Sequence, residues 1–121
     1  MLDSPMLGQT DNFSGDVTVT APTGGYTIGL VYQLNSGAWC VARQTVAAAA
    51  SCLVHILNDQ PVWASKVAAT GKALAVGQDA YYVSGTKNIT PSSTGNTLVG
   101  TCVKAATATD TKVLITSPAA T

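Results

Sequence analysis

The chain has 121 residues, of which 46% are hydrophobic and only 10% are charged. Six basic side chains balance six acids, all of them aspartate, so the formal net charge is zero. This length allows a packed core without disulfides or metals. For a neutral chain we do not expect the clustered positive charge that binding to nucleic acid or to an anionic membrane requires. Because interface cores are depleted of charged residues, so sparse a charge indicates a surface largely covered by partner proteins.

Residues 1–12 predict an extended arm, and residues 13–121 predict a single β domain. Apolar residues in the arm are irregularly spaced and show no helical periodicity. Leu2, Met6 and Leu7, with Phe13 at the junction, would be costly to leave exposed together. We therefore expect these four side chains to contact a neighbouring protein. The alternative is a frayed terminus with no role.

The first half of the domain has the patterns of β-strands. Residues 17–20 alternate valine and threonine, and 26–34 are rich in β-branched and aromatic side chains. An Asn-Ser-Gly turn then leads into 38–43, which predicts a hairpin. The run 45–50 contains four alanines and has the composition of a short helical turn, too short to stand by itself. Residues 52–57 are apolar on both faces, as in a buried strand.

The second half continues in the same manner, with strands separated by Gly, Pro and Asn turns. A long loop is expected over 68–78 because that segment carries two glycines. The expected strands are 62–67, 80–83, 87–89, 97–104 and 112–116. Many short strands with such turns are typical of a β-sandwich or a small β-barrel, so the predicted fold class is all-β.

Apolar positions inside these strand-like runs predict the core. In the hairpin strand, Trp39 and Val41 share one face, and Cys40 and Ala42 share the other. The predicted core consists of Val17, Val19, Val41, Val54, Ile56, Val83, Val99, Val103, Val113 and Ile115.

The sequence contains no complete metal site. Its three cysteines are an odd set without CxxC spacing, so we expect free, buried thiols in a reducing compartment. Cys52 and His55 have ligand-like spacing, but a structural zinc site needs four ligands. The chain has no glutamate to close a calcium loop. Asp16 and Asp110 are expected at turns, where they would bond the local backbone. We expect neither a metal nor a cofactor.

No arrangement of residues predicts catalysis either. His55 is the one histidine, and Ser51 and Asp59 lie near it in sequence. It stands inside an apolar strand, which favours a core or interface histidine over a catalytic one. A Thr-Gly-Lys tripeptide resembles the end of a phosphate loop, but Lys66 replaces the required glycine and Ala73 replaces the magnesium-binding hydroxyl. We expect a protein that is not an enzyme.

The aromatic side chains raise one further alternative, a small β-barrel that binds single-stranded nucleic acid or carbohydrate. Stacked bases need exposed rings beside a basic groove, and the sequence shows no such cluster of basic residues. Packing in the core is therefore the favoured interpretation for the larger aromatic residues, which are Tyr26, Tyr32, Trp39, Trp63, Tyr81 and Tyr82.

Three stretches resemble a family of small head proteins of tailed bacteriophages, the capsid decoration or cement proteins. The first is GDVTVTAPTGG at residues 15–25, and the second runs from Trp39 through the alanine run to Lys66. The third and most specific is TGNTLVG at 94–100, followed by an Ala/Thr-rich loop and DTKV at 110–113. The order and spacing agree over roughly residues 13–117, although relatives are often more acidic in the middle, with a Gly-rich turn at 58–60.

The resemblance implies a compact β fold, a place on the capsid lattice and no catalysis. The implied partner is the major capsid protein, bound at the outer surface of the virion after assembly in the bacterial cytoplasm. A module that bridges capsid subunits would stabilise the shell against the pressure of packaged DNA. A homotrimer suits local threefold positions, and a dimer at twofold positions is the alternative. Leu2, Met6, Leu7 and Phe13 are then expected to contact the capsid.

Overall fold

The computed structural model describes residues 16–118, and within this range every regular element is a β-strand. No helix among these residues is long and apolar enough to cross a membrane. The strands of the first half are β1 (Asp16–Thr20), β2 (Val31–Gln33), β3 (Trp39–Ala42) and β4 (Ser51–Ile56). Those of the second half are β5 (Val62–Ser65), β6 (Asp79–Val83), β7 (Asn88–Thr90), β8 (Thr97–Lys104) and β9 (Lys112–Thr116).

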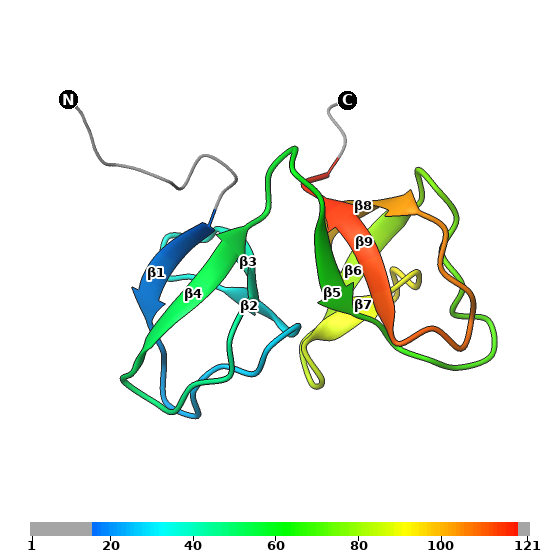
Figure 1. Ribbon diagram of the computed structural model, residues 1–121. Coiled ribbons are helices and arrows are strands. Elements are labelled where there is room, and N and C mark those ends of the chain that lie inside the picture. The colour runs from blue at the N-terminus through cyan, green and yellow to red at the C-terminus, as the bar shows by residue number, and fades with distance from the viewer. Residues whose placement is uncertain (1–15, 119–121) are drawn as a thin grey trace.

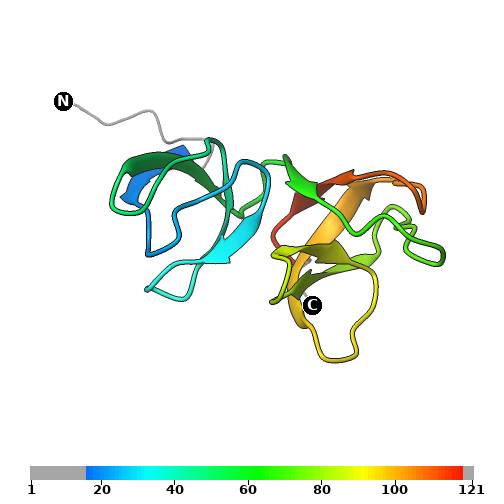
Figure 2. The ribbon, with the colours of Figure 1, turned by 90° about the horizontal axis from the view of Figure 1, so that it is seen from below.

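The strands form two antiparallel sheets that lie side by side (Figures 1 and 2). The first has the order β1-β4-β3-β2 and the second the order β5-β9-β8-β6-β7. The chain completes the first sheet before it begins the second, so each sheet is built from one half of the sequence. The all-β prediction is confirmed. The sheets do not close into a barrel, so the sandwich fits better of the two architectures expected.

The first sheet follows its sequence pattern closely. β4 lies between β1 and β3, which explains why it is apolar on both faces. The predicted hairpin joins β2 and β3, with Gly37 at a φ of +95° in the turn. Cys40 and Ala42 enter one core cluster and Val41 the other, so the predicted division of faces is confirmed.

Two expectations for the first half are wrong. The run 26–34 is not one strand, because the backbone at Gly29 turns at a φ of +87° and only β2 is regular. Tyr26 instead forms an isolated bridge with Val46, through two backbone hydrogen bonds of 3.0 and 2.9 Å. That bridge holds the start of the alanine run extended, so the helical turn does not form there. Ala49 adopts a positive φ of 67° and bonds back to the Ala21 carbonyl.

Two glycines in the stretches that carried the resemblance are required by close approach of the backbone. A Cβ at Gly25 would lie 2.2 Å from the Val46 carbonyl oxygen, at a φ of +72°. A Cβ at Gly100, on β8, would lie 2.5 Å from the carbonyl oxygen of Thr116 on β9. A real Cβ at either distance would push the two chain segments apart.

The core consists of two clusters of buried side chains. The larger fills the second sheet and reaches into the first through Val31 and Val41. The smaller lies on the opposite side of the first sheet and includes Cys40, Cys52 and Val54. Val41 and its neighbours therefore join the two sheets into one packed body.

Most of the predicted core is confirmed. The fully buried members are Val41, Val54, Val99, Val113 and Ile115. Val17, Val19 and Ile56 are partly buried and pack against the smaller cluster. The prediction is wrong for Val83 and Val103, which are half-buried and belong to neither cluster. Strand neighbours point to opposite faces, and the adjacent Tyr82 and Cys102 occupy the inward positions.

Leu74 is a core residue that the sequence patterns missed. It lies in the loop expected over 68–78, yet its side chain is completely buried in the larger cluster. Its backbone exchanges hydrogen bonds of 3.0 and 2.9 Å with Ala106, which places two loops against each other.

Candidate interaction surfaces

His55 holds the start of the first strand in place. Its Nδ1 lies 2.9 Å from Oδ1 of Asp16, and its Nε2 lies 3.2 Å from the Gln60 carbonyl oxygen. Because a carbonyl only accepts, Nε2 is the donor in the second bond. The ring is buried, so the prediction of a core histidine is confirmed. Asp16 is not the turn residue that was expected; it opens β1 and also accepts a bond of 3.3 Å from Arg43.

Lys66, which stands where a phosphate loop would require a glycine, has a structural role. Its side chain is buried, and its Nζ donates to the carbonyl oxygens of Val67, Ala108 and Asp110 at 2.8, 3.2 and 3.2 Å. Burial lowers the pKa of Lys66, and the nearby Asp110 opposes that shift. The Asp110 carboxylate accepts from the Thr107 amide at 2.8 Å, which confirms the predicted turn. Lys66 and Asp110 together fix the loop between β8 and β9.

The three cysteines are free and buried, as expected. Burial raises the pKa of each thiol, and for Cys40 a further contribution from Cys52 brings it to about 11. These groups are therefore thiols, not nucleophilic thiolates, at neutral pH. Within residues 16–118, no group of three or more His, Cys, Asp or Glu side chains could hold a metal ion.

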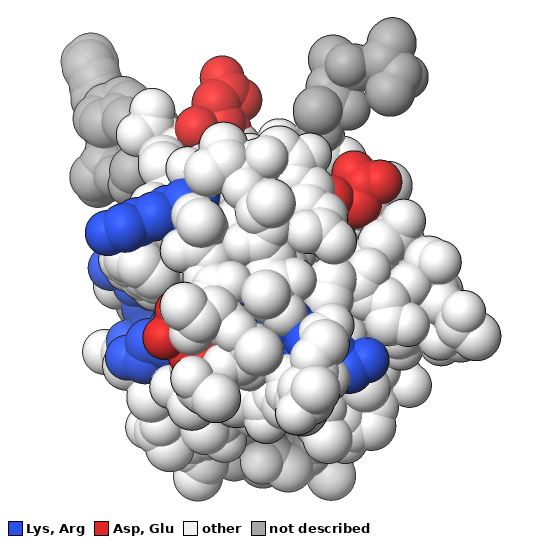
Figure 3. All heavy atoms as spheres, turned by 90° about the vertical axis from the view of Figure 1, so that its right-hand side faces the viewer, with Lys and Arg blue, Asp and Glu red and all other residues white. Residues whose placement is uncertain are grey.

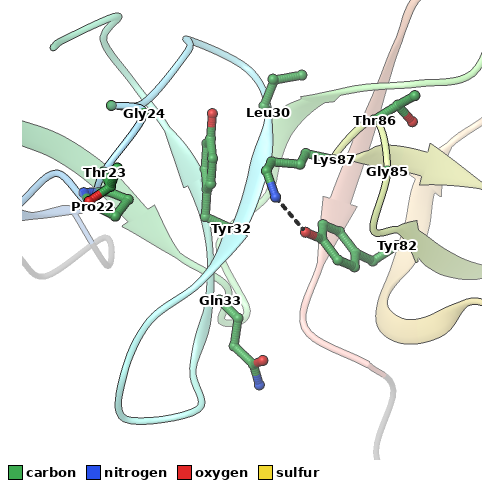
Figure 4. A pocket seen from close by; sticks show the side chains of 11 residues that line it. Pro22, Thr23, Gly24, Leu30, Tyr32, Gln33, Tyr82, Gly85, Thr86 and Lys87 are labelled. Carbon is green, nitrogen blue, oxygen red and sulfur yellow. Dashed lines mark hydrogen bonds between the residues drawn. The ribbon is translucent and has the colours of Figure 1, made fainter. Parts of the chain in front are cut away.

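A groove of about 500 Å³ lies between β2 and the β6–β7 hairpin (Figure 4). Lys87 crosses it, with its Nζ 3.4 Å from the hydroxyl of Tyr82 and 5.7 Å from the ring centre of Tyr32. Both tyrosines are buried, which agrees with their predicted place in the core. The groove thus presents one lysine and the polar turn at residues 22–25, with little aromatic surface.

Trp63 is the clearest exception to the expected packing of aromatic residues, because half of its surface (50%) is exposed. It lies on β5, where Val62 and Ala64 take the inward positions and Trp63 points outward. The period of two in this strand was readable from the sequence, and it is the signal that could have identified an exposed tryptophan.

Trp63 stands between two shallow hollows. One, of about 260 Å³, is lined by Ile28, Arg43 and Lys112 among others, and Ile28 is 59% exposed. The other, of about 320 Å³, is lined by Lys104, Asp110 and Lys112. The Nζ of Lys104 lies 5.7 Å from the centre of the indole ring. We call Ile28, Arg43, Trp63, Lys104 and Lys112 together the Trp63 surface.

Comparison with known families identifies the chain. Residues 9–117 match the family model of the phage cement proteins. The chain belongs to the phage cement protein family. No curated protein and no solved structure matches it. The resemblance to cement proteins is therefore confirmed, and the family name indicates a structural role in the phage particle.

The surface of this cement-family chain is largely uncharged. In Figure 3 most of the visible face is white; several basic side chains lie along its left edge, and another lies near its lower right. The residues expected to bind the capsid, Leu2, Met6, Leu7 and Phe13, lie outside the residues that the structure describes. The division into an arm at 1–12 and a domain at 13–121 also stays a prediction. Apart from the alternation in β5, sequence patterns gave no indication of the Trp63 surface as a candidate site.

Proposed function

We propose that this chain is a decoration protein that binds the outer capsid lattice and stabilises it against the pressure of packaged DNA. The family match over residues 9–117 is the observation that carries the proposal. An all-β body and a sequence with few charged residues support it, because a protein that is covered by partners needs little charge for solubility. The major capsid protein is the proposed partner.

We propose a purely structural role without catalysis. His55 is buried and its ring is bonded to Asp16 and Gln60, not to Ser51 or Asp59 as a catalytic triad would require. The cysteine thiols are buried with raised pKa values. His55 and the three cysteines are therefore engaged or inaccessible as a catalytic base or nucleophile.

Binding to the closed shell stabilises it by mass action. A ligand that binds the intact lattice and not the opened one lowers the free energy of the closed state and slows opening. Each contact can be weak if one oligomer touches several capsid subunits at once. We propose a homotrimer at local threefold positions, with a dimer at twofold positions as the alternative.

The arm is the second proposed element of binding. About twelve extended residues reach on the order of 40 Å, far enough to cross to a neighbouring subunit. There the arm would add a strand to a sheet edge, and Leu2, Met6, Leu7 and Phe13 would fill pockets. Deletion of residues 2–12 is then expected to leave the domain folded and to weaken binding to heads.

The experiment that tests the function uses DNA-filled heads that lack the protein. The full chain is mixed with the heads, bound protein is measured by co-sedimentation, and release of DNA on heating is followed with a fluorescent dye. The proposal predicts saturable binding and a higher release temperature. Saturable binding with no change in the release temperature would contradict the stabilising role. Absence of binding would contradict the proposal as a whole.

A further inference from the structure

We propose that the Trp63 surface docks a protein segment that carries both apolar and acidic side chains. The inference rests on the proposed function, and it names the face of the molecule that meets the capsid and the chemistry of the capsid segment that it meets. It does not involve the arm, so the two contacts can be tested separately.

The apolar part of the surface is large and held in a fixed position. Ile28 and Trp63 are 59% and 50% exposed and line the same hollow. β5 pairs with β9 along its whole length, and the Ser65 amide donates to the Gly29 carbonyl at 2.8 Å. These backbone bonds fix the β5 segment that carries Trp63 relative to the turn that carries Ile28. Exposed tryptophans on rigid elements are the residues that most often dominate binding.

The polar part of the surface is basic. Arg43, Lys104 and Lys112 surround the indole, and they are three of the six basic residues in the chain. Asp16 pairs with Arg43, and Asp110, which accepts from the Thr107 amide through Oδ2, also lines the second hollow, so two carboxylates offset part of this positive charge. In the part of the chain that the structure describes, no acidic side chain forms an ion pair with Lys104 or Lys112. A partner with carboxylates would complement these two ammonium groups.

The same features disfavour other partners. A twofold contact between two copies through this surface would place the basic side chains of one copy against those of the other. Single-stranded nucleic acid needs a row of stacking rings along a basic track, whereas Trp63 is the one exposed large aromatic residue within 16–118. An acidic segment of another protein, and not a second copy of this chain, fits both the basic charge and the single exposed tryptophan.

The first test compares Trp63→Ala with Val76→Ala, using undecorated heads as the probe. Val76 is also exposed, at 67%, but it lines neither hollow of the Trp63 surface. Loss of a central tryptophan is expected to weaken binding about thirty-fold or more, whereas Val76→Ala binds within about twofold of the parent. Urea unfolding confirms that each variant is folded. Ile28→Ser, which leaves β5 intact, provides a second variant and is also expected to weaken binding.

The second test concerns charge. A variant with both Lys104→Glu and Lys112→Glu is compared with Lys72→Glu, whose side chain lines neither hollow. The double variant is expected to lose binding, and Lys72→Glu to retain it. A carbodiimide, which joins amines directly to carboxylates, is then applied to decorated heads. Peptide mass spectrometry is expected to find Lys104 or Lys112 linked to an aspartate or glutamate of the shell protein.

These outcomes separate the inference from the proposed function. If the parent chain does not bind heads, the proposed function fails. If the parent binds and the Trp63 and Ile28 variants bind equally well, the function stands and this docking surface is wrong. Crosslinks found between two copies of this chain and not to the shell would also overturn the inference, as would tight binding of a thymidine oligonucleotide that Trp63→Ala abolishes.

Discussion

Removal of the Cys40 thiol should change how the stability of the protein depends on alkaline pH. Burial of this side chain, reinforced by Cys52, raises the pKa of Cys40 from 9.0 to about 11, and a backbone hydrogen bond at Tyr32 partly opposes the shift. The folded chain therefore keeps the thiol protonated in a range where the unfolded chain ionises it. This contribution to stability is complete below the unfolded pKa and is lost as pH rises through the folded pKa.

The size of the effect follows from the two pKa values. A difference of two pKa units corresponds to about 3 kcal/mol of folding free energy in total, and about half of this is lost by about pH 10. Cys52, Cys102 and Tyr26 also have raised pKa values and add to the alkaline loss, whereas the lowered pKa of Lys66 opposes it. The parent chain and Cys40→Ala share all of these other groups, so most of their difference comes from Cys40 itself, with a smaller part from its contribution to the raised pKa of Tyr26.

Urea unfolding under reducing conditions, followed by tryptophan fluorescence, measures that difference. Cys40→Ala should be less stable than the parent near neutral pH, because it leaves a small cavity. The difference in unfolding free energy between the two proteins should then shrink by roughly 1 kcal/mol between about pH 7 and pH 10. A difference that stays constant across this range would refute the assignment of a buried, protonated thiol.

Four further substitutions test the packing. Leu74→Ala should lower the free energy of unfolding in urea by about 2–5 kcal/mol, because the side chain is fully buried although it lies in a loop. A decrease below about 1 kcal/mol would contradict its place in the core. Gly100→Ala should cost about 1–3 kcal/mol from overpacking against Thr116, whereas Gly85→Ala, with open space around it, serves as the control. Lys66→Met should lower the free energy of unfolding by about 1–3 kcal/mol and expose the loop between β8 and β9 to protease, because three carbonyl oxygens lose their donor; unchanged cleavage would argue against the role of Lys66 in fixing this loop. His55→Ala should lose stability but still bind heads, and abolished head binding by a folded variant would place His55 in the interface.

Most of the strands could be predicted because burial on one face imposes a period of two on the sequence. Cys40, Val41 and Ala42 alternate between the two core clusters as the pattern required. Leu74 could not be placed, because its burial depends on a backbone pairing with Ala106 that no local pattern encodes. The partnership of Asp16 with His55 depends in the same way on the register between β1 and β4.

The site was harder to predict than the fold for a physical reason. Aromatic residues pack in cores far more often than they are left exposed, so Trp63 was assigned by its residue type and not by its position in an alternating strand. The basic residues that surround it lie on different strands and loops, and only the fold brings them together. The arm residues Leu2, Met6, Leu7 and Phe13 are still a prediction from composition and lie outside the residues that the structure describes.

Cryo-electron microscopy of DNA-filled heads, reconstructed with and without the added full-length protein, tests the central claim most directly. The account predicts extra density on the outer face of the lattice, at positions of local symmetry, into which the two-sheet body fits with β5 and Trp63 turned toward the shell. Heads that show no added density on the outer lattice at saturating protein, or density confined to the interior or the tail, would contradict it.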